Sequence, residues 1–227
     1  MKKQALITGA TSGIGRATAL RLAAEGYDIT ATGRRAERLE TLRREIEAAG
    51  GRCTALVFDV RSEAEVRKFL SPLERVDLLI NNAGLAAGLE HIDQGDTADW
   101  DAMIDTNVKG LLYVTRVVTP KMVAAGGGHV FNIGSIAGTE AYENGAVYCA
   151  SKHAVHAVSQ SMRRPAVKRN QGDGDPPRHG RDRIFRGALP RRQGARRPGL
   201  RRRHPAYGRR HRRSDRMGRT ITGPYER

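Results

Sequence analysis

The glycine-rich run Thr-Gly-Ala-Thr-Ser-Gly-Ile-Gly at residues 8–15 constrains the fold more than any other feature of this sequence. It follows an apolar, β-compatible segment at residues 4–8 and precedes a helical pattern at residues 16–25. In such a strand–turn–helix unit the glycines let the backbone approach a pyrophosphate, and the helix N-terminus offers free N–H groups to that anion. We predict a dinucleotide site here, with a turn that binds no ligand as the alternative. The expected site residues are Gly9, Thr11, Ser12, Gly13, Ile14 and Gly15.

The end of the second predicted strand, residues 28–32, indicates which dinucleotide binds. A carboxylate at this place would bind the ribose 2′-hydroxyl and repel a 2′-phosphate. Here the strand is followed by Gly33, Arg34 and Arg35. Two guanidinium groups suit a phosphate dianion, so the sequence favours NADP over NAD. The alternative is that both arginines only begin the helix predicted over residues 36–49 and face solvent.

Tyr148 and Lys152 stand four residues apart in Tyr-Cys-Ala-Ser-Lys, thirteen residues after Ser135. Residues i and i+4 share one face of a helix. A neighbouring ammonium favours a phenolate, and so lowers the pKa of a phenol from its usual value of about 10. This pair therefore predicts an acid/base tyrosine, with Ser135 holding the oxygen of an alcohol or carbonyl substrate. Taken alone, the pair would be read as two exposed helical residues.

Further motifs follow the later predicted strands. They are Asp59-Val60 after the third strand, Asn81-Asn82-Ala83-Gly84 at the end of the fourth (residues 76–80), and Asn107 in Asp-Thr-Asn-Val on a helix. Ser135 ends a fifth strand, residues 129–134. With these motifs, residues 1–164 resemble the short-chain dehydrogenase/reductase family. Within it, the segments 103–107 and 132–135 are similar to NADP-dependent 3-hydroxy acid dehydrogenases of the serine/allo-threonine type.

The resemblance implies a role for each matching residue. Tyr148 is the acid/base, Lys152 binds the nicotinamide ribose and supports the tyrosine, Ser135 orients the substrate oxygen, and Asn107 holds a water in a proton relay. The plainer alternatives are a loop cap for Ser135, a helix cap or kink for Asn107, and turn residues for Asn81-Asn82. Further cofactor contacts implied are Asp59, Val60, Asn81, Ala83, Gly84, Tyr148 and Lys152.

The implied activity is hydride transfer between NADP and a small hydroxy acid or a secondary alcohol/ketone. The alternating strand and helix patterns predict one α/β domain, a doubly wound parallel sheet of the Rossmann type. The resemblance also implies a homo-oligomer if the reading frame of the chain is intact. No run of 18 apolar residues occurs and the N-terminus enters a strand at once, so we expect a cytoplasmic protein without a membrane span or signal peptide. Cys53 and Cys149 fit a reducing compartment, and no histidine cluster predicts a metal site.

The last part of the chain has a different composition. Residues 163–227 hold 22 Lys and Arg against 5 Asp and Glu, whereas residues 1–162 hold 18 against 19, so the net charge of +16 arises entirely beyond residue 162. Seven of the nine prolines lie there and no helical or strand period survives. We therefore divide the chain into a Rossmann domain, 1–164, and a basic tail, 165–227.

Two interpretations of this tail remain. A disordered arginine-rich arm would attract nucleic acid by charge alone, attached to an inactive dinucleotide-binding chain. The other interpretation is a shifted reading frame that replaced the C-terminal strands and the substrate lobe. Shifted codons over residues 170–199 and 211–217 permit a β-branched strand, a Pro-Gly turn and an amphipathic helix in the family's order. We favour the shifted frame and therefore do not expect nucleic-acid binding.

The shifted-frame hypothesis predicts an insertion or deletion in the coding DNA near codons 160–170. Resequencing the gene across that region tests it directly. An uninterrupted frame, together with a tail that folds into ordered sixth and seventh strands, would refute the hypothesis and restore the basic arm.

Overall fold

The computed structural model describes residues 2–163. The predicted tail, the missing C-terminal strands and the shifted frame fall on residues 164–227 and lie outside the described residues. The strands are β1 Gln4–Ile7, β2 Asp28–Gly33, β3 Cys53–Val57, β4 Leu78–Asn81 and β5 His129–Asn132. The helices are α1 Gly13–Ala24, α2 Ala36–Ala48, α3 Glu63–Leu70, α4 Thr97–Ile104, α5 Leu111–Ala124 and α6 Ala146–Arg163, with a π-helical segment at Asp105–Gly110 and a 3₁₀ turn at Ile136–Gly138.

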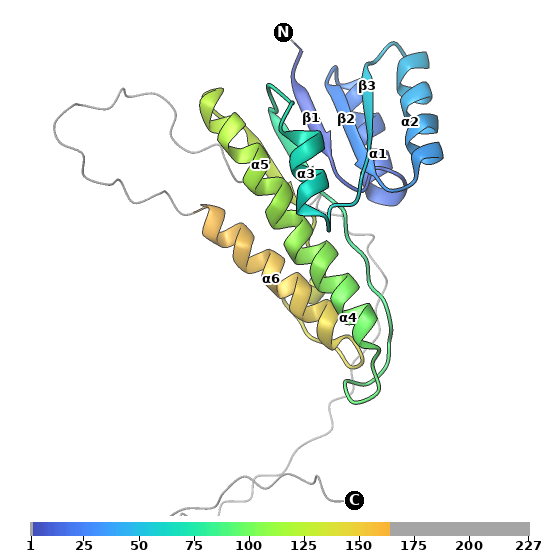
Figure 1. Cartoon of the computed structure of the whole chain (residues 1–227), viewed down its shortest axis with the longest axis vertical. Helices are drawn as coiled ribbons and strands as arrows, with labels where there is room; N and C mark the ends of the chain where they lie inside the picture. The colour runs from blue at the N-terminus through green and yellow to red at the C-terminus, as the bar shows by residue number, and fades with distance from the viewer. Residues whose placement is uncertain (1, 164–227) are drawn as a thin grey trace, which may run out of the picture. The chain divides into compact units, whose positions relative to one another are not determined.

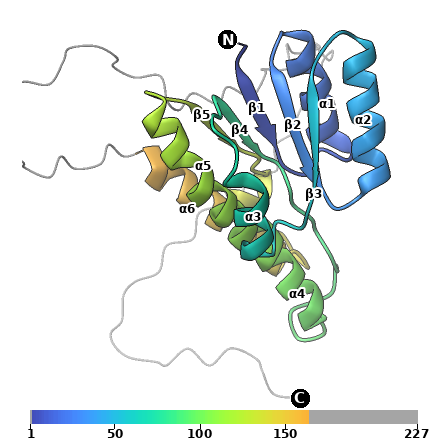
Figure 2. The same ribbon diagram turned by 45° about the horizontal axis from the view of Figure 1, so that its top comes forward.

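The five strands form one parallel sheet in the order β3-β2-β1-β4-β5. The chain runs outward from β1 to β3 and then crosses back to β4 on the other side of β1. Figures 1 and 2 show α1 and α2 together on one side of the sheet, and α3, α5 and α6 on the other. This confirms the predicted doubly wound parallel sheet of the Rossmann type. The topological switch point between β1 and β4 is where ligands bind in such sheets.

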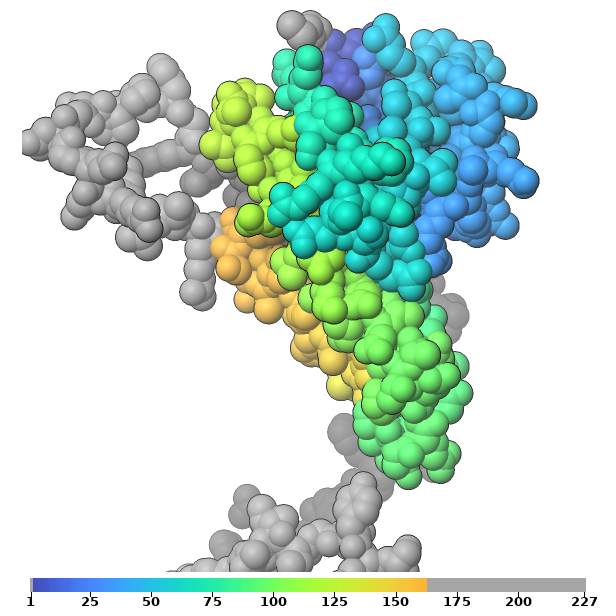
Figure 3. Space-filling view, in the orientation of Figure 1, coloured from blue at the N-terminus to red at the C-terminus, as the bar shows by residue number. Residues whose placement is uncertain are grey.

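The two helix layers bury alternate residues of the strands, because successive side chains of a strand point to opposite faces. Ala5 and Ile7 of β1 pack with Leu39 and Leu42 of α2 on one face. Leu6 packs on the other face, in the cluster that contains buried residues of α3 and α5. α3 and α5 lie side by side over that face (Figure 3). β1 and β4, at the centre of the sheet, are accordingly mostly apolar, as is usual for parallel strands covered on both faces.

The predicted elements are all present, with ends displaced by a few residues. The fourth strand begins at Leu78 rather than at residue 76, and the fifth ends at Asn132 rather than at residue 134. The π-helical segment joins α4 and α5 in right-handed helical conformation at both junctions. A π-helical turn inside an α-helix frequently marks a functional position. No helix among residues 2–163 is long and apolar enough to cross a bilayer.

Candidate active site

The turn after β1 has the geometry of a phosphate-binding loop. Gly9 and Gly13 adopt φ of 65° and 53°, a left-handed conformation that favours glycine. A Cβ on Gly15 would lie 2.5 Å from the Gly9 carbonyl oxygen, so a side chain is excluded there. A Cβ on Gly13 would meet no atom of the described chain within 4 Å, so this side of the turn is open. The backbone is therefore tight against the sheet and accessible at the start of α1.

Asn82 and Thr8 connect this turn to the end of β4. The Asn82 side-chain Nδ2 donates to the carbonyl oxygens of Thr8 and Gly9, at 2.9 and 3.1 Å. Thr8 Oγ1 in turn accepts from the backbone N–H groups of Asn82 and Ala83, each at 3.0 Å. The sequence analysis did not assign Thr8 or Asn82 to the site. The adjacent Asn81-Asn82 pair was the available signal, but it does not say which of the two faces the turn.

Asn81 points elsewhere. Its Nδ2 donates to Thr115 Oγ1 on α5 and to Asn132 Oδ1 on β5, both at 2.9 Å, and the residue is buried. The side chain thus joins the sheet to the helix layer and does not face the glycine turn. The predicted cofactor contact of Asn81 therefore rests on its backbone alone.

The backbone N–H groups at the N-terminus of α1 are not capped by the Ser12 side chain. Ser12 occupies the N-cap position but does not cap α1 with its side chain; instead its Oγ accepts from Arg35 Nη2 at 2.8 Å. The first-turn N–H groups of α1 have no acidic side chain beside them in that turn. Free N–H groups and the helix dipole at this end suit an anion. The donor set therefore fits a pyrophosphate, as the sequence predicts for residues 9–15.

The two predicted phosphate-reading arginines differ in how they are held. Arg35 is fixed above the turn, because its Nε and Nη2 donate to Thr11 Oγ1 at 3.1 and 2.5 Å. The Arg34 side chain is 60% exposed and lies 3.7 Å from Asp59 Oδ2. Burial acts to raise the pKa of Asp59, but hydrogen bonds from Arg61 outweigh it and hold that pKa below its usual value. Asp59 therefore stays ionised beside Arg34.

The Lys152 side chain lies between the Tyr148 ring and the backbone just after β5. Its Nζ donates to the Ile133 carbonyl oxygen at 3.0 Å and lies 5.8 Å from the centroid of the Tyr148 ring. Lys152 is only 8% exposed, and this burial lowers the pKa of its ammonium group. The i, i+4 spacing on α6 thus places the two side chains together, as the sequence predicts.

Ser135 begins the 3₁₀ turn Ile136–Gly138, and this turn packs against α6. Ser135 Oγ accepts from the Ala137 N–H at 3.2 Å, so the capping alternative is realised. Gly138 packs against the backbone of Lys152, where a Cβ would lie 2.7 Å from the carbonyl oxygen. A hydroxyl that accepts one bond can still donate its own proton. Capping and contact with a substrate oxygen are therefore compatible for Ser135.

Asn107 lies in the π-helical segment and is 1% exposed. Its Oδ1 accepts from the Leu85 N–H at 2.8 Å, and its Nδ2 donates to the Leu85 carbonyl at 2.8 Å and to Ser151 Oγ at 3.0 Å. Both amide N–H groups are thus used within the protein. The water-holding role that the resemblance implies for Asn107 stays a prediction. In this structure neither side-chain N–H of Asn107 is available to donate to such a water.

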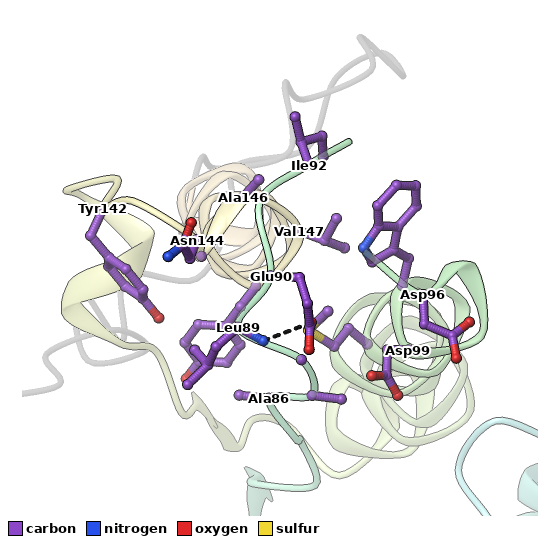
Figure 4. A pocket seen from close by; sticks show the side chains of 16 residues that line it. Ala86, Leu89, Glu90, Ile92, Asp96, Asp99, Tyr142, Asn144, Ala146 and Val147 are labelled. Atoms are coloured by element: carbon purple, nitrogen blue, oxygen red, sulfur yellow. Dashed lines mark hydrogen bonds between the residues drawn. The ribbon is translucent and has the colours of Figure 1, made fainter. Parts of the chain in front are cut away.

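A pocket opens beside Tyr148, between the segment after β4, α4 and the start of α6. Figure 4 shows Glu90 and Asp99 on one side of it and Tyr142 and Asn144 on another. Glu90 accepts from the Leu89 N–H at 2.9 Å. The described residues that line the pocket include three carboxylates and no lysine or arginine. The sequence does not predict this pocket, because residues 86–96 carry no recognisable binding or catalytic motif.

The buried ammonium predicts a pH-dependent stability difference for Lys152→Met. Because the folded pKa of Lys152 lies below its ordinary value of 10.5, the unfolded chain binds more protons between the two values. The parent's free energy of unfolding should therefore rise with pH in that window, and the variant should lack this contribution. We expect the stability of the variant relative to the parent to be highest at neutral pH and to fall toward pH 10.5, measured by urea denaturation.

Lys109→Met is the matched control. A hydrogen bond from Lys109 to Asp105 raises its pKa, so the stabilisation it gives is fully present below pH 10.5 and is lost above it. Its variant should show the opposite trend, with the deficit disappearing only at alkaline pH. A pH-independent difference for Lys152→Met would contradict the burial argument.

Comparisons with known proteins agree with this geometry. The sequence model of the short chain dehydrogenase family matches residues 3–170. The chain is 44% identical over 162 residues to NADP-dependent 3-hydroxy acid dehydrogenase YdfG of Salmonella typhi, covering 70% of this chain and 64% of that protein. It is 45% identical over 163 residues to sulfoacetaldehyde reductase 2 of Chromohalobacter salexigens, with the same coverage. The chain thus spans less than two thirds of the length of these curated relatives.

Solved structures give the same result. Serine dehydrogenase from Escherichia coli superposes with a TM-score of 0.67 at 43% identity, covering 70% of this chain and 74% of that one. The closed form of serine dehydrogenase complexed with NADP⁺ also gives 0.67 at 43% identity, covering 70% and 65%. The family match covers well over half of the chain and includes every motif on which the predicted resemblance rests. The chain therefore belongs to the short chain dehydrogenase family.

Proposed function

We propose that this protein is an NADP-dependent oxidoreductase that transfers a hydride between the nicotinamide and a small hydroxy acid or a secondary alcohol/ketone. The observation that carries the proposal is the buried Lys152 ammonium beside the Tyr148 ring, with Ser135 at the start of the 3₁₀ turn that packs against α6. The glycine turn lies at the same carboxyl edge of the sheet, at the switch point between β1 and β4. A proton-transfer group and a phosphate cradle at one edge are the two parts that hydride transfer needs.

The choice of NADP rests on the residues after β2. Gly33 is followed by Arg34 and Arg35, and the only carboxylate paired with Arg34 among the described residues is Asp59 on the neighbouring strand end. Arg35 is already oriented by Thr11, and Arg34 is exposed enough to turn toward a ligand. Similar proteins whose names or titles state NADP support the same choice.

The bound nicotinamide would supply the hydride acceptor in oxidation and the donor in reduction. Tyr148 is the group placed to take the proton from a substrate hydroxyl, or to return it to a carbonyl oxygen, at its phenolic oxygen. The Lys152 ammonium lies 5.8 Å from the centroid of the Tyr148 ring, so a positive charge is held close to the group that exchanges the proton. Ser135 can donate to the substrate oxygen, which fixes that oxygen relative to Tyr148.

The substrate class is extended from similar proteins and not from the pocket beside Tyr148, whose lining holds three carboxylates. The relatives include enzymes named for 3-hydroxy acids and for sulfoacetaldehyde, all with an oxygen on a short polar chain. We extend to this chain the same class, together with the cytoplasmic location and the homo-oligomeric state expected from the sequence. The rival proposal is an inactive dinucleotide-binding chain whose basic residues 163–227 bind polyanions; it predicts NADPH binding without turnover.

Tyr148→Phe tests the assignment of the acid/base in the protein as its natural gene expresses it. We expect kcat to fall by about 10²–10⁴-fold with NADPH and sulfoacetaldehyde, or with NADP⁺ and serine or 3-hydroxybutyrate, while the Kd for NADPH stays near that of the parent. Tyr27→Phe, at the far end of α1, is the control for loss of a phenol. Near-parental kcat in Tyr148→Phe would reject Tyr148 as the acid/base; a parent that binds NADPH but turns over no probe would favour the rival.

Arg34→Ala tests the preference for NADP. A charge-assisted hydrogen bond to the 2′-phosphate contributes about 1.5–3 kcal/mol, so the KM for NADP should rise about 10- to 100-fold while the KM for NAD changes little. Arg44→Ala, on the exposed side of α2, controls for loss of a surface arginine. Equal effects on both cofactors would show that Arg34 does not read the phosphate, and Arg35→Ala would then identify which arginine does.

A further inference from the structure

Ser151 is buried on α6 between Tyr148 and Lys152 and is 0% exposed. Its Oγ donates to the Tyr148 carbonyl oxygen at 2.7 Å and accepts from Asn107 Nδ2 at 3.0 Å. The hydroxyl therefore uses its single proton and one of its lone pairs inside the protein. A buried hydroxyl with both kinds of partner satisfied is fixed in one orientation.

These bonds form part of a longer connection across three segments. Asn107 uses its other amide N–H and its Oδ1 to bond both backbone groups of Leu85, each at 2.8 Å. Leu85 follows Ala83 and Gly84, and a Cβ on Gly84 would lie 3.1 Å from Asn107 Oδ1 and 3.7 Å from Lys152 Nζ. The chain of bonds thus runs from the segment after β4, through the π-helical segment, to the turn of α6 that carries Tyr148.

We propose that Ser151 is a positioning residue that holds Tyr148 and Lys152 in register with the segment after β4 by orienting the Asn107 amide. The inference rests on the proposed function for the role of Tyr148, but the hydrogen-bonded connection itself does not. Without the Ser151 hydroxyl, one Asn107 N–H loses its partner in a buried site, and only the two bonds to Leu85 still orient the amide. Small displacements of reacting groups reduce rates strongly, because the bound geometry must be a near-attack one.

The chain contains a matched control on the same helix. Ser159 Oγ donates to the Val155 carbonyl at 2.7 Å and accepts from Asn132 Nδ2 at 2.9 Å, so it makes the same two kinds of bond further along α6. Ser159→Ala removes an equivalent hydroxyl without touching Asn107 or Leu85. Any effect that merely reflects a weaker α6 should appear in both alanine variants.

Ser151→Cys separates the hydrogen bonds from the space that the side chain fills. Cysteine keeps the shape of serine with a larger sulfur atom, so it leaves no cavity, but it is a weak donor and acceptor. A defect caused by a cavity should be corrected in Ser151→Cys, whereas a defect caused by lost hydrogen bonds should persist. The same variant gives a usable protein if the alanine variant does not fold.

The experiment makes two kinds of measurement on the full chain. The first is hydrogen–deuterium exchange at the Leu85 amide, whose N–H is held by Asn107 Oδ1. The second is kcat and KM with NADPH and sulfoacetaldehyde, and with NADP⁺ and serine. We expect Ser151→Ala and Ser151→Cys to speed exchange at Leu85 about tenfold or more and to lower kcat about 10- to 100-fold with KM nearly unchanged. Ser159→Ala should change neither quantity.

Three results would overturn the inference: parental exchange at Leu85 in Ser151→Ala, full correction by cysteine, or equal defects in Ser159→Ala. If the parent turns over none of the probes, the proposed function fails, and exchange at Leu85 alone decides whether Ser151 orients Asn107. Failure of one proposal is therefore distinguishable from failure of the other.

Discussion

The hydrogen bonds between Asn82 and the turn after β1 are the constraint on which the rest of the site depends. They join two strand ends that the chain reaches far apart in sequence, β1 and β4, at the switch point of the sheet. Asn82 bonds two successive carbonyls of the turn and fills the space beside Gly9 and Gly15, so the turn is held against the end of β4. These hydrogen bonds position the N-terminus of α1. They also position the start of the segment after β4, which leads to Leu85.

The second half of the site depends on how α6 meets the sheet. Asn81, Asn132 and Ser159 form a polar connection from β4 through β5 to the middle of α6. Lys152 and Ile133 form a second one closer to the carboxyl edge, and Asn107 with Ser151 forms a third from the π-helical segment. Buried polar groups are costly unless satisfied, so the second and third connections, which lie nearest to Tyr148, admit few orientations of this end of the helix. Tyr148 is therefore presented by a helix with little freedom to rotate.

Charge is distributed unevenly around this edge. Three arginines, Arg34, Arg35 and Arg61, lie near the glycine turn and suit phosphate. Asp59 stays ionised beside Arg34 and Arg61. The pocket beside Tyr148 is lined by Glu90, Asp96 and Asp99. In between, the only buried cation of the described site is Lys152, and burial alone disfavours its charge. Lys152 therefore lies between the basic region near the glycine turn and the acidic pocket beside Tyr148, and its burial sets how readily it carries a charge there.

The sequence by itself determined the parts of this protein that depend on local rules. Strand–turn–helix order, the glycines with positive φ and the Tyr148–Lys152 spacing follow from period and backbone sterics, so they were predictable within a few residues. Only the tertiary structure decided which of Asn81 and Asn82 faces the turn, because their side-chain partners on α5, β5 and the turn after β1 are distant in the sequence. It also decided that Asn107 bonds Leu85 and Ser151, since those partners are 22 and 44 residues away and no local pattern relates them.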